Sequence, residues 1–372
     1  MKISRISCWS VPIPLREPYV LRGGRTRVDA LDSTIIRIDT DAGVHGWGEA
    51  CPWGKRYLPA HATGICAGVA TIAPDLIGES PLGLEHVSRV MDAALPGHLY
   101  VKSGLDIACW DILGKVAGLP LWQLFGGASP TPVEALASVL SMDPDDMARA
   151  LQGNSARGIR THSVKLGDTD PTKDIDRIRA VDAALPQGER ITWDANRGWT
   201  PGTALQVLNS TGTAHWVEQP CETIEECATV AARVQNPIML DECLHSFEDH
   251  QRAWSLRAAQ GVKIKPGRVG GLTRARQVRD YGVSLGWQMH IEGLGGGGLE
   301  HMAILHLASS TPESHRLASW PGDDLVDVDI CQGTGARTTE GVITPHSTPG
   351  HGTTPDEDAL GDPIAVYTAE AA

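Results

Sequence analysis

From about Val133 onward, short apolar runs alternate with longer amphipathic segments at a nearly constant interval. A short apolar run that closes on a polar residue is typical of a buried strand, and apolar residues at helical spacing are typical of a helix. The predicted strands are VEALASVL, THSVKLG, RITWDANRG, AHWVEQP, PIMLDE, GVKIKPG, WQMHIEG and HRLASWPG. Eight strand–helix units in about 190 residues predict a (β/α)8 barrel, because an open doubly wound sheet would show fewer units and a less even spacing.

The first 130 residues have a different texture and predict an α+β region. Residues 33–50 predict two strands joined by a turn at Asp41-Ala42-Gly43. Residues 103–127 begin with a predicted helix that stops at Gly118 and Pro120, because glycine and proline end helices. We therefore expect an N-terminal α+β domain followed by a barrel domain.

The composition excludes several classes of function. A net charge of −13 argues against nucleic acid or an anionic membrane surface as the main partner. No apolar run of about 18 residues is present, and the first residues lack the apolar block and cleavage site of a signal peptide. The eight cysteines show no CxxC pairing, so we expect reduced thiols in a cytoplasmic protein.

The residues that close successive predicted strands are polar and lie 23 to 29 positions apart: Lys165, Asp194, Glu218, Asp241, Lys265 and His290. One strand–helix unit takes about that many residues, so each side chain is expected near the C-terminal end of its own strand. In a barrel these ends form one rim, where active sites are built. Six residues that are far apart in the sequence are therefore predicted to meet at one cavity.

Three of these residues are carboxylates from neighbouring strands, namely Asp194, Glu218 and Asp241. Carboxylates that face one another in a partly dry cavity repel, and their pKa values rise unless a cation lies among them. Oxygen ligands favour a hard cation, and Mg²⁺ also keeps positions open for water and substrate. We therefore predict a Mg²⁺ site; the alternative is that each residue is a solvated carboxylate or a helix cap.

Lys165 and Lys265 come from the strands before and after these carboxylates. A substrate held at the metal would have one lysine on each face, which suits general acid–base chemistry at a carbon next to a carboxylate. A lysine base needs a pKa lowered towards neutrality, and a nearby dication and desolvation would both lower it. The alternative is that the lysines are salt-bridge partners of the carboxylates. Lys263 shares strand parity with Lys265 and is expected in a deeper layer, where it would neutralise a carboxylate.

Further residues are expected to shape the pocket. His290 and Glu292 share strand parity, so they form either a satisfied polar pair at the rim or contacts to the ring nitrogen or hydroxyl of a substrate. Trp53 and Tyr57 would reach the pocket from loops of the N-terminal region. The candidate substrate-binding residues are Asn196, His290, Glu292, Trp320, Trp53 and Tyr57.

A glycine run, GLGGGG at residues 293–298, matches the spacing of a dinucleotide-binding fingerprint between a predicted strand and a predicted helix. It lies late in the chain, and no βαβ half follows that would complete a dinucleotide-binding fold. We therefore interpret it as a barrel loop that lets the backbone approach a ligand closely.

The motifs together resemble the enolase superfamily, specifically its muconate-lactonizing-enzyme-like branch, over essentially the full chain. The stretches that carry the resemblance are LDIACWDILGKVAGLPLWQLFGG, SVKLG, DANRGW, VEQP, the Asp241-Glu242 pair and KIKPGRVGG. The resemblance implies a capping domain (residues 1–130), a barrel (131–335) and a C-terminal segment (336–372) that returns to the cap. It also implies Mg²⁺ on Asp194, Glu218 and Asp241, with Lys165 and Lys265 as the acid/base pair.

One position departs from the branch, which usually carries Lys-x-Lys on the second barrel strand. Here Ser163 replaces the first lysine, so Lys165 lacks a like-charged neighbour that would help to lower its pKa. This single-lysine form, with GEACPWG and DANRGW, is similar to enzymes that act on proline derivatives, among them cis-3-hydroxy-L-proline dehydratases and hydroxyproline-betaine epimerases.

The leading hypothesis is therefore Mg²⁺-dependent dehydration of cis-3-hydroxy-L-proline by a homo-oligomeric enzyme that binds a small carboxylate. The first rival is an epimerase of proline, hydroxyproline or proline betaine that uses the same lysines without a redox cofactor. The second rival is an oxidoreductase that uses the loop at Gly293, and the third is a catalytically silent binding protein.

Overall fold

The computed structural model describes residues 1–54, 57–328 and 330–369. Its centre is a parallel sheet with the strand order β11-β10-β9-β8-β7-β6-β5. The strands are β5 (Leu136–Val139), β6 (Thr161–Lys165), β7 (Arg190–Asp194), β8 (Trp216–Glu218), β9 (Ile238–Leu240), β10 (Gly261–Ile264) and β11 (Gln288–Ile291). All seven fall inside the strands predicted from the alternation.

The eighth predicted strand does not form a regular strand, but its residues still close the sheet. The closing segment, residues 316–319, makes isolated parallel bridges to Met289 of β11 and to Ala135 beside β5. Its backbone accepts a hydrogen bond from Leu136 N at 2.9 Å and donates one to Met289 O at 2.9 Å. A 3-10 turn (Glu313–His315) and Pro321, which has no N–H, lie at the two ends of the segment.

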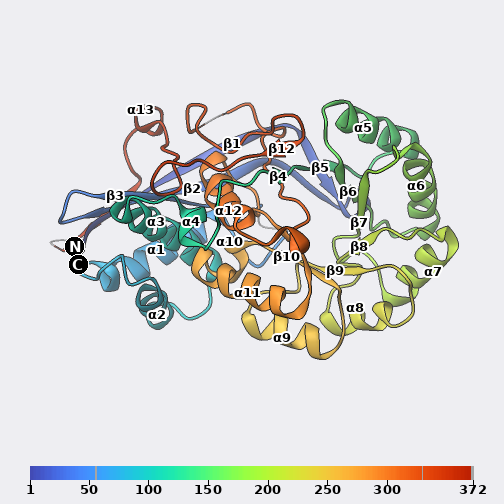
Figure 1. Cartoon of the computed structure of the whole chain (residues 1–372), viewed down its shortest axis with the longest axis horizontal. Helices are drawn as coiled ribbons and strands as arrows, with labels where there is room; N and C mark the ends of the chain where they lie inside the picture. The colour runs from blue at the N-terminus through green and yellow to red at the C-terminus, as the bar shows by residue number, and fades with distance from the viewer. Residues whose placement is uncertain (55–56, 329, 370–372) are drawn as a thin grey trace.

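Helices follow the strands and cover the outside of the barrel (Figure 1). They are α5 (Pro144–Ala156), α6 (Pro171–Ala184), α7 (Pro201–Thr211), α8 (Ile224–Ala231), α9 (Phe247–Ser255), α10 (Pro266–Val269), α11 (Leu272–Leu285) and α12 (Gly298–Ser309). Local sequence fixes where several of them begin. The side chain of Asp170 accepts a hydrogen bond from Thr172 N ahead of Pro171, and Thr223 and Glu226 form a capping box at α8.

The cap contains an antiparallel sheet in the order β13-β1-β2-β3, formed by both ends of the chain. Its strands are β1 (Ile3–Leu21), β2 (Thr26–Thr40), β3 (His45–Ala50) and β13 (Ala365–Thr368). Its helices are α1 (Ala62–Leu76), α2 (Leu84–Ala94), α3 (Leu99–Ala117) and α4 (Leu121–Leu124), and the tail adds α13 (Glu357–Leu360) and a short pairing of β12 (Val342–Ile343) with β4 (Val133–Glu134). The long ribbon of β1 and β2 runs from the cap across the barrel (Figure 1). The domain bounds at residues 130 and 335 remain a prediction.

Helix α3 is buried on all sides because it lies between the cap sheet and the barrel. A Cβ atom on Gly48 of β3 would lie 1.9 Å from the carbonyl oxygen of Gly104, so only glycine allows this close approach. The helix ends at Gly118, whose φ of 67° lies in the left-handed region, as predicted from the sequence.

The described residues form three apolar cores. The largest fills the barrel and the space beneath its helices, and the second joins the cap sheet to α1, α2 and α3. The third lies where the β1–β2 ribbon meets the barrel mouth and includes Tyr19, Trp53 and Trp320. The cap and the barrel are therefore packed together around the ends of the barrel strands.

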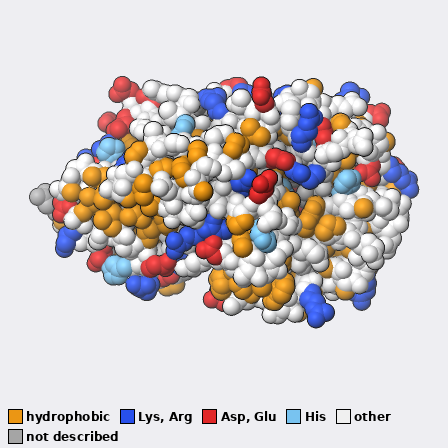
Figure 2. All heavy atoms as spheres, viewed as in Figure 1, with side chains coloured by type: hydrophobic (Ala, Val, Ile, Leu, Met, Phe, Trp, Pro, Cys, Tyr) orange, Lys and Arg blue, Asp and Glu red, His pale blue; other side chains and the backbone are white. Residues whose placement is uncertain are grey.

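The distribution of charged side chains on the surface and the state of the cysteine thiols can be compared with the composition. Acidic and basic side chains are interspersed over the face in Figure 2, and apolar side chains gather towards its cap end. No disulfide joins any of the eight cysteines, all of which lie in the described residues. No helix in the described part of the chain is long and apolar enough to cross a bilayer.

Candidate active site

The strand register brings five predicted site residues to one rim of the barrel. Lys165, Asp194 and Glu218 are the last residues of β6, β7 and β8, and they are register partners of their neighbours across these strands. Asp241 and Lys265 follow directly after β9 and β10. The even spacing seen in the sequence therefore corresponds to neighbouring strand ends.

Each lysine forms an ion pair with one of the carboxylates. Lys165 Nζ lies 2.5 Å from Asp194 Oδ2, and Lys265 Nζ lies 2.8 Å from Asp241 Oδ2. Burial disfavours the charged lysines, but the carboxylates outweigh it and raise the pKa of both. The sequence predicted a lowered pKa for these lysines, whereas the carboxylates raise it. The prediction assumed that a dication binds the carboxylates; here the lysine ammonium groups pair with them instead.

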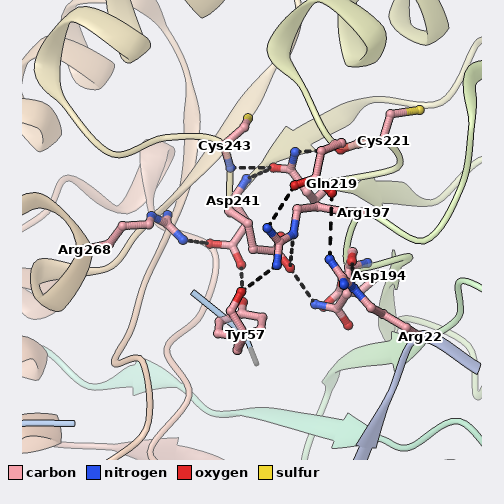
Figure 3. Close-up of polar contacts among 12 residues, drawn as sticks. Arg22, Tyr57, Asp194, Arg197, Gln219, Cys221, Asp241, Cys243 and Arg268 are labelled. Carbon is pink, nitrogen blue, oxygen red and sulfur yellow. Dashed lines mark hydrogen bonds and ion pairs between the residues drawn. The ribbon is translucent and has the colours of Figure 1, made fainter. Parts of the chain in front are cut away.

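Asp241 is held from both sides in a buried network (Figure 3). Arg268 donates to Asp241 Oδ1 at 2.6 Å, while Tyr57 donates its hydroxyl to Oδ2 at 3.2 Å. Gln219, the residue after Glu218, accepts a hydrogen bond from the backbone N of Asp241 at 2.7 Å. Burial alone would raise the pKa of Asp241, but Arg268 and Lys265 hold it well below its usual range.

Of the three carboxylates, Glu218 has the fewest hydrogen bonds and ion pairs to offset its negative charge. Neither of its side-chain oxygens makes a hydrogen bond, although Lys263 Nζ lies 2.9 Å from Oε2. Burial and the nearby charge of Asp194 raise its pKa well above the usual range. Lys263 also pairs with Glu292 at 3.1 Å, which confirms the prediction that it neutralises a carboxylate in a deeper layer.

The donor set suits a hard dication. Asp194 and Asp241 each have Oδ1 fixed by the protein, through the backbone N of Asn196 and through Arg268, so that Oδ2 remains as the second oxygen. Glu218 adds two buried oxygens without hydrogen bonds. As the side chains stand, however, no three His, Cys, Asp or Glu groups of the described chain lie close enough to hold a metal. The ligand set therefore remains a prediction, and it requires the lysine ammonium groups to leave Oδ2 of each aspartate.

A cavity opens between the two lysines. It is lined by Tyr19, Leu21, Trp53, Tyr57, Leu136, Ser138, Ser163, Lys165, Asn196, Lys263, Lys265, Glu292, Gly293, Leu294 and Trp320. The structure thus brings five of the six predicted substrate-binding residues to the lysines. The sixth, His290, lies at the barrel wall with Nδ1 3.1 Å from Ala318 O and is not part of this lining; burial lowers its pKa to about 3.

Aromatic side chains cover the cavity, with Tyr19, Trp53 and Tyr57 coming from the cap and Trp320 from the barrel. The ring centroids of Tyr19 and Trp53 are 4.9 Å apart, and those of Trp53 and Trp320 are 5.5 Å apart, both edge to face. Each lysine also faces one tyrosine: Lys165 Nζ lies 6.0 Å from the ring of Tyr19, and Lys265 Nζ lies 5.7 Å from the ring of Tyr57. The cap therefore supplies an aromatic roof above both ammonium groups.

Sequence reasoning missed several of these residues. Arg268 lies in the KIKPGRVGG motif, three residues after Lys265. Its closeness in sequence to this candidate catalytic lysine could have indicated a place at the site. Tyr19 and Ser138 gave none, because the fold alone brings β1 across the end of β5, where the Tyr19 hydroxyl lies 2.5 Å from Ser138 Oγ.

The glycine loop serves the contact between cap and barrel. The carboxylate of Glu49 on β3 accepts hydrogen bonds from the backbone N of Gly297 at 2.5 Å and of Glu300 at 3.0 Å. A protein carboxylate thus occupies the N-terminus of α12, where a nucleotide phosphate would have to bind. At Gly296, with φ of 104°, a Cβ atom would lie 2.6 Å from Glu300 Oε2, which explains the glycine.

Family models and curated relatives match most of this chain. The model of the enolase C-terminal domain-like family matches residues 146–359, and that of the mandelate racemase/muconate lactonizing enzyme N-terminal domain matches residues 5–126. A cis-3-hydroxy-L-proline dehydratase of Roseibium aggregatum is 38% identical over 99% of this chain and 100% of its own. An N-succinyl-L-Arg/Lys racemase of Bacillus cereus is 30% identical over 83% of this chain and 85% of its own.

A solved structure of an enolase superfamily member also matches nearly the whole chain. An enolase superfamily member from Roseovarius nubinhibens, crystallised with magnesium, has a TM-score of 0.95 and 57% identity, and the match covers 99% of both chains. Two family models that together span both parts of the chain, and relatives that match nearly all of it, lead to one conclusion. The chain belongs to the enolase superfamily, in its mandelate racemase/muconate lactonizing enzyme branch.

Proposed function

We propose that this protein abstracts the proton α to the carboxylate of a proline-type substrate and dehydrates cis-3-hydroxy-L-proline to pyrroline-2-carboxylate. The observation that carries the proposal is the pair of buried lysines, Lys165 and Lys265, on opposite sides of one small cavity beside three carboxylates. The likeness to a cis-3-hydroxy-L-proline dehydratase over the whole chain supports the choice of substrate.

The chain's own residues account for the proton transfers. A lysine that has lost its proton takes the α-proton on Nζ; the C3–O bond then breaks as the Cα–C3 double bond forms. The same or the other lysine gives a proton to the departing hydroxyl, which leaves as water, and the enamine product tautomerises. Asp194, Glu218 and Asp241 would hold Mg²⁺, which when bound would stabilise the negative charge that develops on the substrate carboxylate.

The test is loss of water from a panel of hydroxyprolines, measured with purified protein and Mg²⁺. We expect turnover of the cis-3 isomer, abolished in Lys165→Ala or Lys265→Ala and retained in Lys173→Ala, whose side chain is 61% exposed on α6. Turnover that survives both site substitutions would reject the lysine assignment. A parent protein without turnover, whose ligand affinity stays unchanged in Lys165→Ala and Lys265→Ala, would favour a binding protein.

A second candidate function is epimerisation of a proline betaine, and the aromatic roof favours it. Faces of Trp and Tyr attract quaternary ammonium groups, and Tyr19, Trp53 and Trp320 meet above the cavity. In that reaction the two lysines would exchange protons with opposite faces of Cα. Deuterium from the solvent appearing at Cα without loss of oxygen would identify the epimerase, and water loss would identify the dehydratase.

The cellular setting is part of the proposal. We infer a homo-oligomeric enzyme of amino-acid catabolism in the cytoplasm; the free cysteine thiols support the cytoplasmic location alone. An oxidoreductase on the glycine loop is disfavoured because Glu49 already binds the N-terminus of α12.

A further inference from the structure

The order of the barrel strands gives the cavity an acidic side and a distal side. The predicted metal ligands close β7, β8 and β9, and β8 lies opposite the closing segment in the ring of strands. If the substrate carboxylate lies at the acidic side and Cα lies between the lysines, the remaining ring extends towards β5, β11 and Trp320. This distal half of the cavity therefore recognises the ring and its substituents.

Most of the distal half suits ring carbons. Leu136, Leu294 and Trp320 line it, and Tyr19 covers it from the cap. The floor is different, because Ser138 of β5 and Ser163 of β6 are register partners and both line the cavity. An apolar wall above a hydroxyl-bearing floor fits a ring that carries one polar substituent.

The two floor serines are not equivalent. Ser138 Oγ is already bonded to the Tyr19 hydroxyl at 2.5 Å. Ser163 is 1% exposed, and its Oγ has no hydrogen-bond partner. A buried polar group without a partner costs free energy unless a ligand or water satisfies it, so this hydroxyl is prepared for a bound group.

A second atom at the cavity has the same property. Glu292 uses Oε1 to pair with Lys263, and its Oε2 has no hydrogen-bond partner. A carboxylate oxygen accepts only, whereas a serine hydroxyl donates and accepts. A hydroxyl is a ring substituent that can pair with either atom, because it also does both.

We propose that Ser163 is a specificity-determining residue whose hydroxyl hydrogen bonds to a hydroxyl on the substrate ring. The inference rests on the proposed function for the orientation of the substrate, and it gives a role to the position where this chain departs from Lys-x-Lys. A lysine at residue 163 would fill the space in which the ring hydroxyl is bound.

The experiment compares two ligands that differ by one hydroxyl, cis-3-hydroxy-L-proline and L-proline. For the first we would measure kcat/KM for loss of water, and for the second the inhibition constant as a competitor. Ser163→Ala should lower kcat/KM about three- to tenfold, the worth of one neutral hydrogen bond, and leave the inhibition constant of L-proline within about twofold. The substitution removes only an unpartnered oxygen, so the variant is expected to fold normally.

The matched control is Ser103→Ala on α3, which removes another buried and unpartnered hydroxyl outside the cavity and should change neither constant. Equal losses for both ligands in Ser163→Ala, or no loss for either, would overturn the inference. If no hydroxyproline is turned over, the proposed function fails. The dissociation constants of the same two ligands, measured by calorimetry, would then decide the role of Ser163 separately.

Discussion

Replacing Lys263 by methionine should destabilise the protein by a predictable amount. The side chain is only 2% exposed, and its ammonium lies between the carboxylates of Glu218 and Glu292. Lys263→Met keeps the length of the apolar stem and removes the charge. Both carboxylates then remain buried without the Lys263 ammonium. Lys265, 3.5 Å from Glu292, still offsets part of the charge of that carboxylate.

The magnitude follows from the cost of stranding a buried charge. Removing one partner of a buried ion pair costs about 3–5 kcal/mol, and the remaining contact to Lys265 places the expected value near the lower end. For 372 residues the unfolding entropy is roughly 0.8 kcal/mol/K, so a loss of about 3 kcal/mol should lower the midpoint of thermal unfolding by about 4 °C. The double variant Lys263→Met/Glu292→Gln should recover part of this loss, because one of the two stranded charges is absent.

The assay is thermal unfolding at neutral pH, followed by circular dichroism. Lys102→Met is the matched control: its stem is equally buried, but its partner Asp92 is 46% exposed and also pairs with Arg274. The control should lose about 1 kcal/mol or less, because water and Arg274 solvate the remaining carboxylate. Equal losses in the two variants, or a midpoint for Lys263→Met within about 1 °C of the parent, would refute the reasoning.

Three further predictions concern the fold, the pH dependence and the metal. Gly48→Ala should lower the free energy of unfolding by about 3 kcal/mol or more, because its Cβ would lie 1.9 Å from Gly104 O; denaturant titration measures this, and a neutral result would contradict the packing. Burial lowers the pKa of His250 to about 4, so below its unfolded value of 6.5 the unfolded state binds a proton that the folded state excludes. Stability should therefore fall by about 3 kcal/mol as the pH drops from 7 to 4, and a parallel pH profile in His250→Phe would reject that source. Arg268→Met should weaken Mg²⁺ binding by about 10- to 100-fold in calorimetry, because it releases Oδ1 of Asp241; unchanged affinity would exclude Arg268 as a positioning residue.

The barrel and its rim could be predicted from the sequence because both depend on short-range patterns. Each predicted strand closes on a polar residue, and these residues recur at the interval of one strand–helix unit. The spacing therefore assigns Lys165, Asp194 and Lys265 to the C-terminal ends of their strands, which form one rim. The closing segment was less predictable. Its residues have the pattern of an eighth strand, yet they form only isolated bridges, with a 3-10 turn and a proline at the two ends.

The walls of the cavity could be predicted only in part, because they depend on tertiary contacts. Tyr19 and Ser138 lie more than a hundred residues apart and carry no motif that links them. The direction of the lysine pKa shifts could not be predicted from the sequence either, because it depends on which group pairs with each carboxylate. His290 had the expected strand position, but its ring faces the carbonyl of Ala318 at the barrel wall.

The pairing of β13 with β1 imposes an order on how this enzyme is made. A ribosome finishes every barrel strand before it reaches residues 365–368, so the cap sheet gains its edge strand β13 only after the strands of the barrel have been made. A growing chain, or one cut near residue 360, would have all seven strands of the parallel sheet but a cap sheet without the strand that pairs with residues 5–8 of β1.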